Sequence, residues 1–144
     1  MRVAVTGGTG FTGGHTLKKL IDAGHEPVAL VRSAEKLKRV AELHQIPQIS
    51  HVIGDVSDIR AISSLLEGCD AAMHIAAVTG TQIRKIPSLK ATNIEGTRIV
   101  LEEAAKREMD PIVYVSSQST LHPPPEDHYM ANGPLSEDPV GVYA

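Results

Sequence analysis

In VAVTGGTGFTGGH, residues 3–15, closely spaced glycines join an apolar strand-like run to the start of a helical pattern. Gly7, Gly10 and Gly13 fall three residues apart at this junction. A backbone that must turn sharply, approach a pyrophosphate closely and let a helix pack on a sheet needs residues without a Cβ. The N–H groups at the helix start then face the phosphates. The stretch predicts a dinucleotide-binding turn; the alternative is a tight connection without a ligand.

The rest of the chain alternates short apolar runs with longer segments of helical period. The apolar runs are typical of strands covered on both faces of a parallel sheet, and they are residues 2–6, 26–31, 49–54, 71–77 and 111–116. The helical segments between them are residues 12–23, 34–44, 58–67 and 87–107. This alternation predicts an α/β fold, a Rossmann-type doubly wound parallel sheet. Right-handed crossovers favour the strand order 3-2-1-4-5.

Local signals indicate where the predicted helices begin, end and face. Gly24 is the expected C-cap of the first helix, and Asp58 is the expected N-cap of the third. Helical spacing in the fourth segment predicts an inward face made of Leu89, Ile94, Ile99, Val100 and Ala104. Residues 118–139 are rich in proline and polar side chains, so we expect a long loop there.

Composition narrows the class of protein. The chain has 144 residues, 42% hydrophobic and 22% charged, which fits one globular domain. A net charge of −3 argues against a nucleic-acid surface. Cys69 is the one cysteine, so we expect a reducing, cytoplasmic compartment. No run approaches the ~18 apolar residues of a membrane span. His122 and His128 lack paired carboxylates at ligand spacing, so no metal site is expected.

The order of motifs resembles the extended short-chain dehydrogenases/reductases, the NAD-dependent epimerase/dehydratase family. Its fingerprint TGxxGxxG is matched by TGGTGFTG at residues 6–13. The later motifs follow in the family's order: GDVSD at 54–58, HIAA at 74–77, NIEGT at 93–97, YVSS at 114–117, and Tyr143. The resemblance covers the whole chain, and an ordered set of motifs is far more specific than any one of them.

The resemblance implies which residues hold the cofactor. Those of the glycine turn are Gly7, Thr9, Gly10, Phe11, Thr12 and Gly13. Asp55 and Val56 follow the third strand, where the family contacts adenine, although Asp55 could instead cap the next helix. Ala76 and Ala77 end the fourth strand, where the family's backbone runs beside the cofactor. His74, flanked by apolar residues, is expected to be a packed strand-end residue rather than a catalytic one.

The end of the second strand bears on the choice between NAD and NADP. NAD sites of this kind place an acidic residue there to bind the ribose. This sequence has Arg32 and Ser33 instead, and Lys36 adds charge nearby. A guanidinium suits a 2′-phosphate in geometry and charge. NADP is therefore predicted over NAD; the alternative is that Arg32 is an ordinary exposed residue.

The resemblance also implies the catalytic groups. Tyr143 would be the acid/base, Ser117 would orient the reacting oxygen (with Ser116 and Ser119 as alternatives), and Asn93 would have a role in the site. A tyrosine with a pKa near ~10 needs help from a nearby cation, and the family's lysine would fall beyond Ala144. Residues 1–144 are thus expected to be an incomplete NAD(P)-binding Rossmann domain, without its C-terminal strands and substrate lobe, and inactive alone.

The implied activity is hydride transfer at a carbonyl or hydroxyl carbon of a small-molecule substrate. The parent enzyme would be a reductase, a dehydrogenase or an epimerase/dehydratase. The competing hypothesis is a non-catalytic NADP-binding sensor, against which Tyr143 argues because a sensor needs no phenol. Family members often dimerise through helices, so the resemblance makes a homodimer one candidate assembly, while the sequence leaves the oligomeric state open. Neither nucleic acid nor a membrane is expected as a partner.

Overall fold

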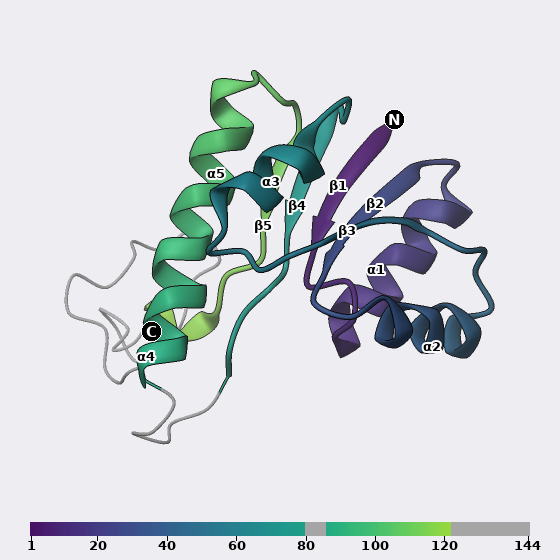
Figure 1. Cartoon of the computed structure of the whole chain (residues 1–144), viewed down its shortest axis with the longest axis horizontal. Coiled ribbons are helices and arrows are strands. Elements are labelled where there is room, and N and C mark those ends of the chain that lie inside the picture. Colours follow the sequence, from purple (N-terminus) through teal and green to yellow (C-terminus); the bar gives the residue numbers. More distant parts are fainter. Residues whose placement is uncertain (80–85, 122–144) are drawn as a thin grey trace.

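The computed structural model describes residues 1–79 and 86–121, which form a parallel sheet flanked by helices (Figure 1). Its strands are β1 (Arg2–Thr6), β2 (Glu26–Val31), β3 (Ser50–Ile53), β4 (Ala71–His74) and β5 (Ile112–Tyr114). All neighbouring pairs are parallel, and the strand order is β3-β2-β1-β4-β5. The predicted doubly wound sheet and its strand order are confirmed.

The helices lie within one residue of their predicted bounds, but the fourth segment consists of three consecutive helical elements. They are α1 (Phe11–Asp22), α2 (Ala34–His44), α3 (Ile59–Leu66), α4 (Ile86–Leu89), the π-helix η2 (Lys90–Gly96), α5 (Thr97–Lys106) and the 3₁₀ turn η3 (Gln118–Leu121). Asp58 caps α3 by accepting a hydrogen bond from the Arg60 nitrogen at 2.9 Å. Gly24 follows α1 with φ of +77°, a conformation that glycine adopts without strain. The predicted N-cap is confirmed, whereas the C-cap of α1 is Ala23 and Gly24 is the residue after it.

Alternating side chains of the sheet divide the core between its two faces. Val3 and Val5 of β1 pack with Leu17 of α1 on one face. Ala4, between them, belongs to the other face with Ile62 of α3 and Val100 of α5. The chain runs from β1 outward to β3 and then returns to β4 on the other side of β1. The carboxyl ends of β1 and β4 therefore form a topological switch point, where open α/β sheets bind ligands.

The fourth helical segment departs from the prediction at Ile94. Leu89, Ile99, Val100 and Ala104 are buried as expected, but Ile94 is 64% exposed. Residues of an α-helix advance by about 100° each, so Ile94, five residues after Leu89, stands about 140° around the helix from it and does not share its inward face. Within the π-helix η2, the side-chain amide of Asn93 pairs with the backbone of Val78. The predicted orientation of Ile94 is wrong.

The last two strands are also shorter than predicted. The fourth run was expected to reach residue 77 and the fifth residue 116, but β4 ends at His74 and β5 at Tyr114. Residues beyond both ends leave the sheet and line a pocket. Within residues 1–79 and 86–121, no helix combines the length and apolar character needed to cross a bilayer.

Candidate functional site

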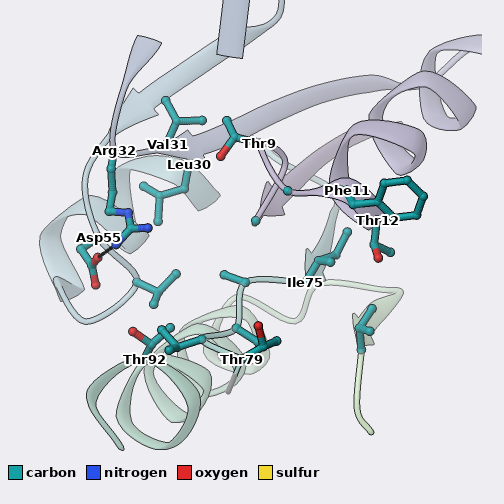
Figure 2. Close-up of a pocket in the computed structure, with 18 of the residues that line it drawn as sticks. Thr9, Phe11, Thr12, Leu30, Val31, Arg32, Asp55, Ile75, Thr79 and Thr92 are labelled. Carbon is teal, nitrogen blue, oxygen red and sulfur yellow. Dashed lines mark ion pairs between the residues drawn. The ribbon is translucent and has the colours of Figure 1, made fainter. Parts of the chain in front are cut away.

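A pocket of about 500 Å³ opens at the carboxyl ends of the strands, between the β1–α1 turn and the ends of β2, β3 and β4 (Figure 2). Its wall contains every residue for which a cofactor contact is predicted: Gly7, Thr9, Gly10, Phe11, Thr12, Gly13, Arg32, Asp55, Val56, Ala76 and Ala77. Segments far apart in the sequence thus meet at one site. The pocket lies at the switch point between β1 and β4.

The wall also holds residues that the sequence did not single out as contacts. They are Leu30, Val31, Gly54, Ile75, Val78, Thr79, Thr92 and Val115, together with Lys36 and Ser116, which the sequence offered only as secondary candidates. Most directly precede or follow a predicted contact at a strand end, and this adjacency could have identified them. Thr92 had no such signal, because it reaches the wall through the π-helical turn of η2.

The glycine turn is closed by contacts between main-chain atoms. Gly7 has φ of +74°, and a Cβ there would lie 2.6 Å from the Ala76 nitrogen. A Cβ on Gly13 would collide with the carbonyl oxygen of Gly7. Side chains at these two positions would therefore push the turn away from β4 or from α1. Gly7 and Gly13 are required by the protein's own packing.

Gly10 is glycine for a different reason. Its φ of −86° suits any residue, and among residues 1–79 and 86–121 a Cβ there would approach only the Gly7 oxygen, at 3.4 Å. The protein itself tolerates a side chain at Gly10, which is exposed on the pocket wall. A bare main chain at this position keeps space open for something outside the protein.

The first turn of α1 presents hydrogen-bond donors at the same place. Gly10 is the N-cap residue, and its carbonyl accepts the first helical bond from the Gly14 nitrogen at 2.9 Å. The N–H groups of the intervening residues have no acceptor within a helix, and no acidic side chain lies in this first turn. The helix dipole places partial positive charge at these donors. The exposed Phe11 ring turns away against His15, with 5.0 Å between ring centroids. The turn can bind phosphate groups.

A buried chain of hydrogen bonds links β1, β4 and α5 beneath the pocket. The Thr6 hydroxyl oxygen accepts from the backbone nitrogens of Ile75 at 3.3 Å and Ala76 at 3.2 Å. It lies 2.6 Å from Nδ1 of His74, and Nε2 of His74 lies 2.9 Å from the Thr97 hydroxyl. Because the Thr6 oxygen already accepts two bonds, its own proton is donated to Nδ1. The His74 ring then carries its proton on Nε2 and donates it to Thr97.

His74 is a structural residue of this chain rather than an acid or base facing the pocket. It is 1% exposed and stacks on Tyr114, with ring centroids 5.8 Å apart. Burial lowers the pKa of His74 from 6.5 to about 4, so the ring is neutral at physiological pH. The burial confirms the prediction of a packed strand-end histidine. Through Thr6, the neutral ring helps to fix the Ala76 nitrogen against Gly7.

Two opposite charges flank the pocket beyond β2 and β3. Nη1 of Arg32 lies 3.9 Å from Oδ2 of Asp55 (Figure 2), and the Arg32 side chain is 80% exposed. The other carboxylate oxygen of Asp55 accepts from the nitrogen and the hydroxyl of Ser57, at 3.1 and 2.8 Å. Asp55 therefore closes a local turn, while the cap of α3 is Asp58. Helix capping, the alternative role for Asp55, does not apply.

The structure describes only some of the residues predicted for catalysis. Asn93 does not line the pocket; its Oδ1 accepts from the Val78 nitrogen at 2.8 Å and its Nδ2 donates to the Val78 oxygen at 2.9 Å. Both amide atoms are thus engaged, and Asn93 holds Val78 on the wall. Ser116 lines the pocket and Ser117 lies next to it in the chain. Tyr143, like His122 and His128, lies outside the described residues.

Comparison with known proteins adds independent information about the chain. The family model described as "NAD dependent epimerase/dehydratase family" matches residues 3–144. The chain is 32% identical over 126 residues to dTDP-glucose 4,6-dehydratase of Streptomyces antibioticus, covering 81% of this chain and 37% of that enzyme. It is 29% identical over 127 residues to 3-beta-hydroxysteroid dehydrogenase of Mycolicibacterium neoaurum, covering 83% of this chain and 33% of that enzyme. The chain thus spans about a third of the length of these curated relatives.

Solved structures resemble the fold over almost its full length. UDP-glucose 4-epimerase of Bifidobacterium longum, in complex with NAD+ and UDP, superposes with a TM-score of 0.82 at 23% identity, covering 99% of this chain and 44% of that one. dTDP-glucose 4,6-dehydratase of Streptomyces venezuelae, with NAD and TYD bound, gives a TM-score of 0.80 at 26% identity, covering 99% and 47%. The first likeness supports the sheet topology described above.

Proposed function

Because this chain belongs to the NAD-dependent epimerase/dehydratase family, we propose that its pocket binds a nicotinamide dinucleotide, with the pyrophosphate at the start of α1. The observation that carries the proposal is Gly10. Neither its backbone conformation nor its neighbours within the protein require glycine, yet it borders the first-turn N–H groups of α1. A pyrophosphate bound against bare main chain accounts for both features.

The remaining wall residues fit the two ends of such a ligand. Arg32, Asp55 and Val56 follow β2 and β3 and would surround the adenosine. Ala76 and Ala77 follow β4 and would lie along the middle of the cofactor. Ser116 follows β5 and would face the nicotinamide end. The pocket thereby offers charge at one end and small apolar side chains along the other part of its length.

For the choice of cofactor, we propose NADP over NAD. Arg32 and Lys36 both line the pocket beyond β2, where an acidic residue would favour NAD. A guanidinium that is 80% exposed is free of the core and can turn to a 2′-phosphate. The two solved relatives above contain NAD, so this chain would differ from them in its preference.

The reaction we propose is hydride transfer at a carbonyl or hydroxyl carbon of a small molecule, as in the reductases, dehydrogenases and epimerases/dehydratases of the family. The bound nicotinamide supplies the hydride chemistry. Tyr143 would exchange the proton of the reacting oxygen, and Ser117, with Ser116 and Ser119 as alternatives, would hydrogen-bond that oxygen. Asn93 would act as a positioning residue, since its amide holds Val78.

Calorimetric titration of the protein with NADPH and with NADH tests the binding proposal. We expect one saturable site per chain and a lower Kd for NADPH. Failure of both nucleotides to bind would overturn the proposal, and tighter binding of NADH would overturn the preference for NADP. For the reaction, Tyr143→Phe in any longer form of the protein should lower kcat about a hundredfold or more and leave the Kd for NADPH within twofold, whereas an unchanged kcat would exclude Tyr143.

A further inference from the structure

We propose that Asp55 is a specificity-determining residue, which opposes the binding of a 2′-phosphate at Arg32 and so narrows the preference for NADP over NAD. The inference rests on the proposed dinucleotide site and deepens it. Its starting point is the juxtaposition of opposite charges on the pocket wall, where Oδ2 of Asp55 lies 3.9 Å from Nη1 of Arg32.

The pairing of β2 with β3 determines this juxtaposition. Val31 and Ile53 are register partners at the ends of these strands, and the Gly54 nitrogen extends the ladder by donating to the Val31 oxygen at 3.0 Å. Arg32 follows β2 immediately, and Asp55 stands two residues beyond β3. Figure 2 shows the two side chains directed toward each other at the edge of the pocket. The carboxylate therefore accompanies any ligand group that Arg32 binds.

The turn at Ser57 holds the carboxylate in this place. Oδ1 of Asp55 accepts from both the nitrogen and the hydroxyl of Ser57, which leaves Oδ2 directed to Arg32. Arg32 has no comparable restraint, because its side chain is 80% exposed and its ion pair is long. When a ligand binds, the guanidinium can move to it, whereas the negative charge of Asp55 stays.

The consequence differs between the two cofactors. A 2′-phosphate at Arg32 brings a second anion near Asp55, and like charges at such short range repel each other. A ribose that carries a free 2′-hydroxyl meets no such repulsion, and it can donate a hydrogen bond to a carboxylate. Asp55 therefore weakens the binding of NADPH and tolerates NADH. The effect should diminish with ionic strength, because the groups are exposed.

Asp55→Asn is the variant that isolates the charge. The amide oxygen of asparagine can still accept from Ser57, so the turn is retained. We expect the ratio of Kd for NADH to Kd for NADPH to rise about fivefold to tenfold at low salt, and the gain to shrink in 0.5 M salt. Glu35→Gln is the charge-matched control, because Glu35 pairs with Arg39 on α2 and is not on the pocket wall. In this variant the ratio of Kd for NADH to Kd for NADPH should stay within twofold of the wild-type ratio.

The outcomes separate this inference from the proposed function. If the wild type binds neither nucleotide, the proposed function fails. If it binds them and Asp55→Asn changes both Kd values by the same factor, Asp55 contacts only the shared adenosine and the inference is overturned. Asp55→Ser, which keeps a hydroxyl acceptor, is measured as well in case the asparagine variant does not fold. In an Arg32→Gln background, Asp55→Asn should raise the ratio by less than it does in the wild type; an equal rise would show that Asp55 acts independently of Arg32.

Discussion

The two ends of the pocket differ in what holds them in place. At the β1–α1 turn, Gly7 and Gly13 are in contact with other main-chain atoms, and no side chain could be added without moving the backbone. Beyond β2 and β3, Arg32 and Asp55 are joined by one long ion pair between exposed groups. Such a pair contributes little to stability, typically below about 1 kcal/mol.

Under the proposed function, this difference separates the binding of phosphates from the choice of cofactor. The β1–α1 turn is packed against other main-chain atoms at Gly7 and Gly13, so changing either residue costs stability. The charges at the other end can be replaced without disturbing the sheet, because their side chains project from it. If Arg32 and Asp55 set the cofactor preference as proposed, substitution at either can change that preference while the turn persists. Substitutions near each end show whether the two ends differ as much as their contacts indicate.

The largest effect is expected at Gly13. In Gly13→Ala the added Cβ would overlap the carbonyl of Gly7 and lie 2.7 Å from the Gly8 Cα. Since main-chain atoms cannot rotate away, α1 must separate from the turn, and we expect a loss of about 4 kcal/mol or more in the free energy of unfolding. Urea denaturation measures this loss. A variant within 1 kcal/mol of the wild type would show that the turn is looser than its contacts imply.

A smaller loss is expected from Thr6→Val. The change removes the acceptor of the Ala76 nitrogen and the donor to Nδ1 of His74, which is buried. Leaving these groups without partners should cost about 2 to 3 kcal/mol. Thr6→Ser keeps the hydroxyl and serves as the matched control, with an expected loss of about 1 kcal/mol. Equal losses in the two variants would mean that the hydroxyl has no part in holding β4.

The pKa of His74 predicts a dependence of stability on pH. The pKa is lowered from 6.5 to about 4 in the folded protein, so the unfolded chain binds the proton more tightly. The contribution of this group is present above pH 6.5 and is lost as the pH falls toward 4. Between pH 8 and pH 5 the loss should be about 2 kcal/mol. The loss is measured as the difference between the wild type and His74→Gln in the slope of the free energy of unfolding against pH. Both proteins contain the same other histidines, so their contributions cancel in the difference.

Identical slopes in those two proteins would contradict the assignment of a neutral, buried His74. Imidazole nitrogen chemical shifts provide a second measurement. At pH 5.5 they should report a neutral ring with its proton on Nε2, as the donation by Thr6 requires. A proton on Nδ1 would show that the hydrogen bonds run in the opposite direction.

The smallest effect is expected at Gly24, far from the pocket wall. A Cβ there meets nothing within 4 Å, but φ of +77° is strained for alanine. Gly24→Ala should lower the free energy of unfolding by about 1 kcal/mol and leave nucleotide binding unchanged. Thermal denaturation checks the first expectation, and a rise in stability would contradict it.

Local signals explain why so much of the fold could be predicted. The glycine turn, the apolar strands, the N-cap Asp58 and the glycine that follows α1 each depend on residues that are near one another in the sequence. The expectation for Ile94 fails because it lies five residues from both Leu89 and Ile99, a spacing that does not repeat on one face of an α-helix. The π-helix η2, in which Asn93 pairs with Val78 fifteen residues away, cannot be seen in local periodicity. The ion pair of Arg32 with Asp55 likewise requires the register of β2 on β3, which composition and spacing do not reveal.

The proposed contact between the pyrophosphate and the main chain at Gly10 is tested by titrating three proteins with NADPH: Gly10→Ala, Gly24→Ala and the wild type. The side chain added at Gly10 fits the protein but enters the space assigned to the pyrophosphate. We expect Gly10→Ala to raise the Kd for NADPH about tenfold or more. Gly24→Ala should keep that Kd within twofold of the wild type. The free energy of unfolding of Gly10→Ala should be at least as large as that of Gly24→Ala. Binding by Gly10→Ala as tight as that of the wild type would contradict the claim that phosphates lie against this main chain.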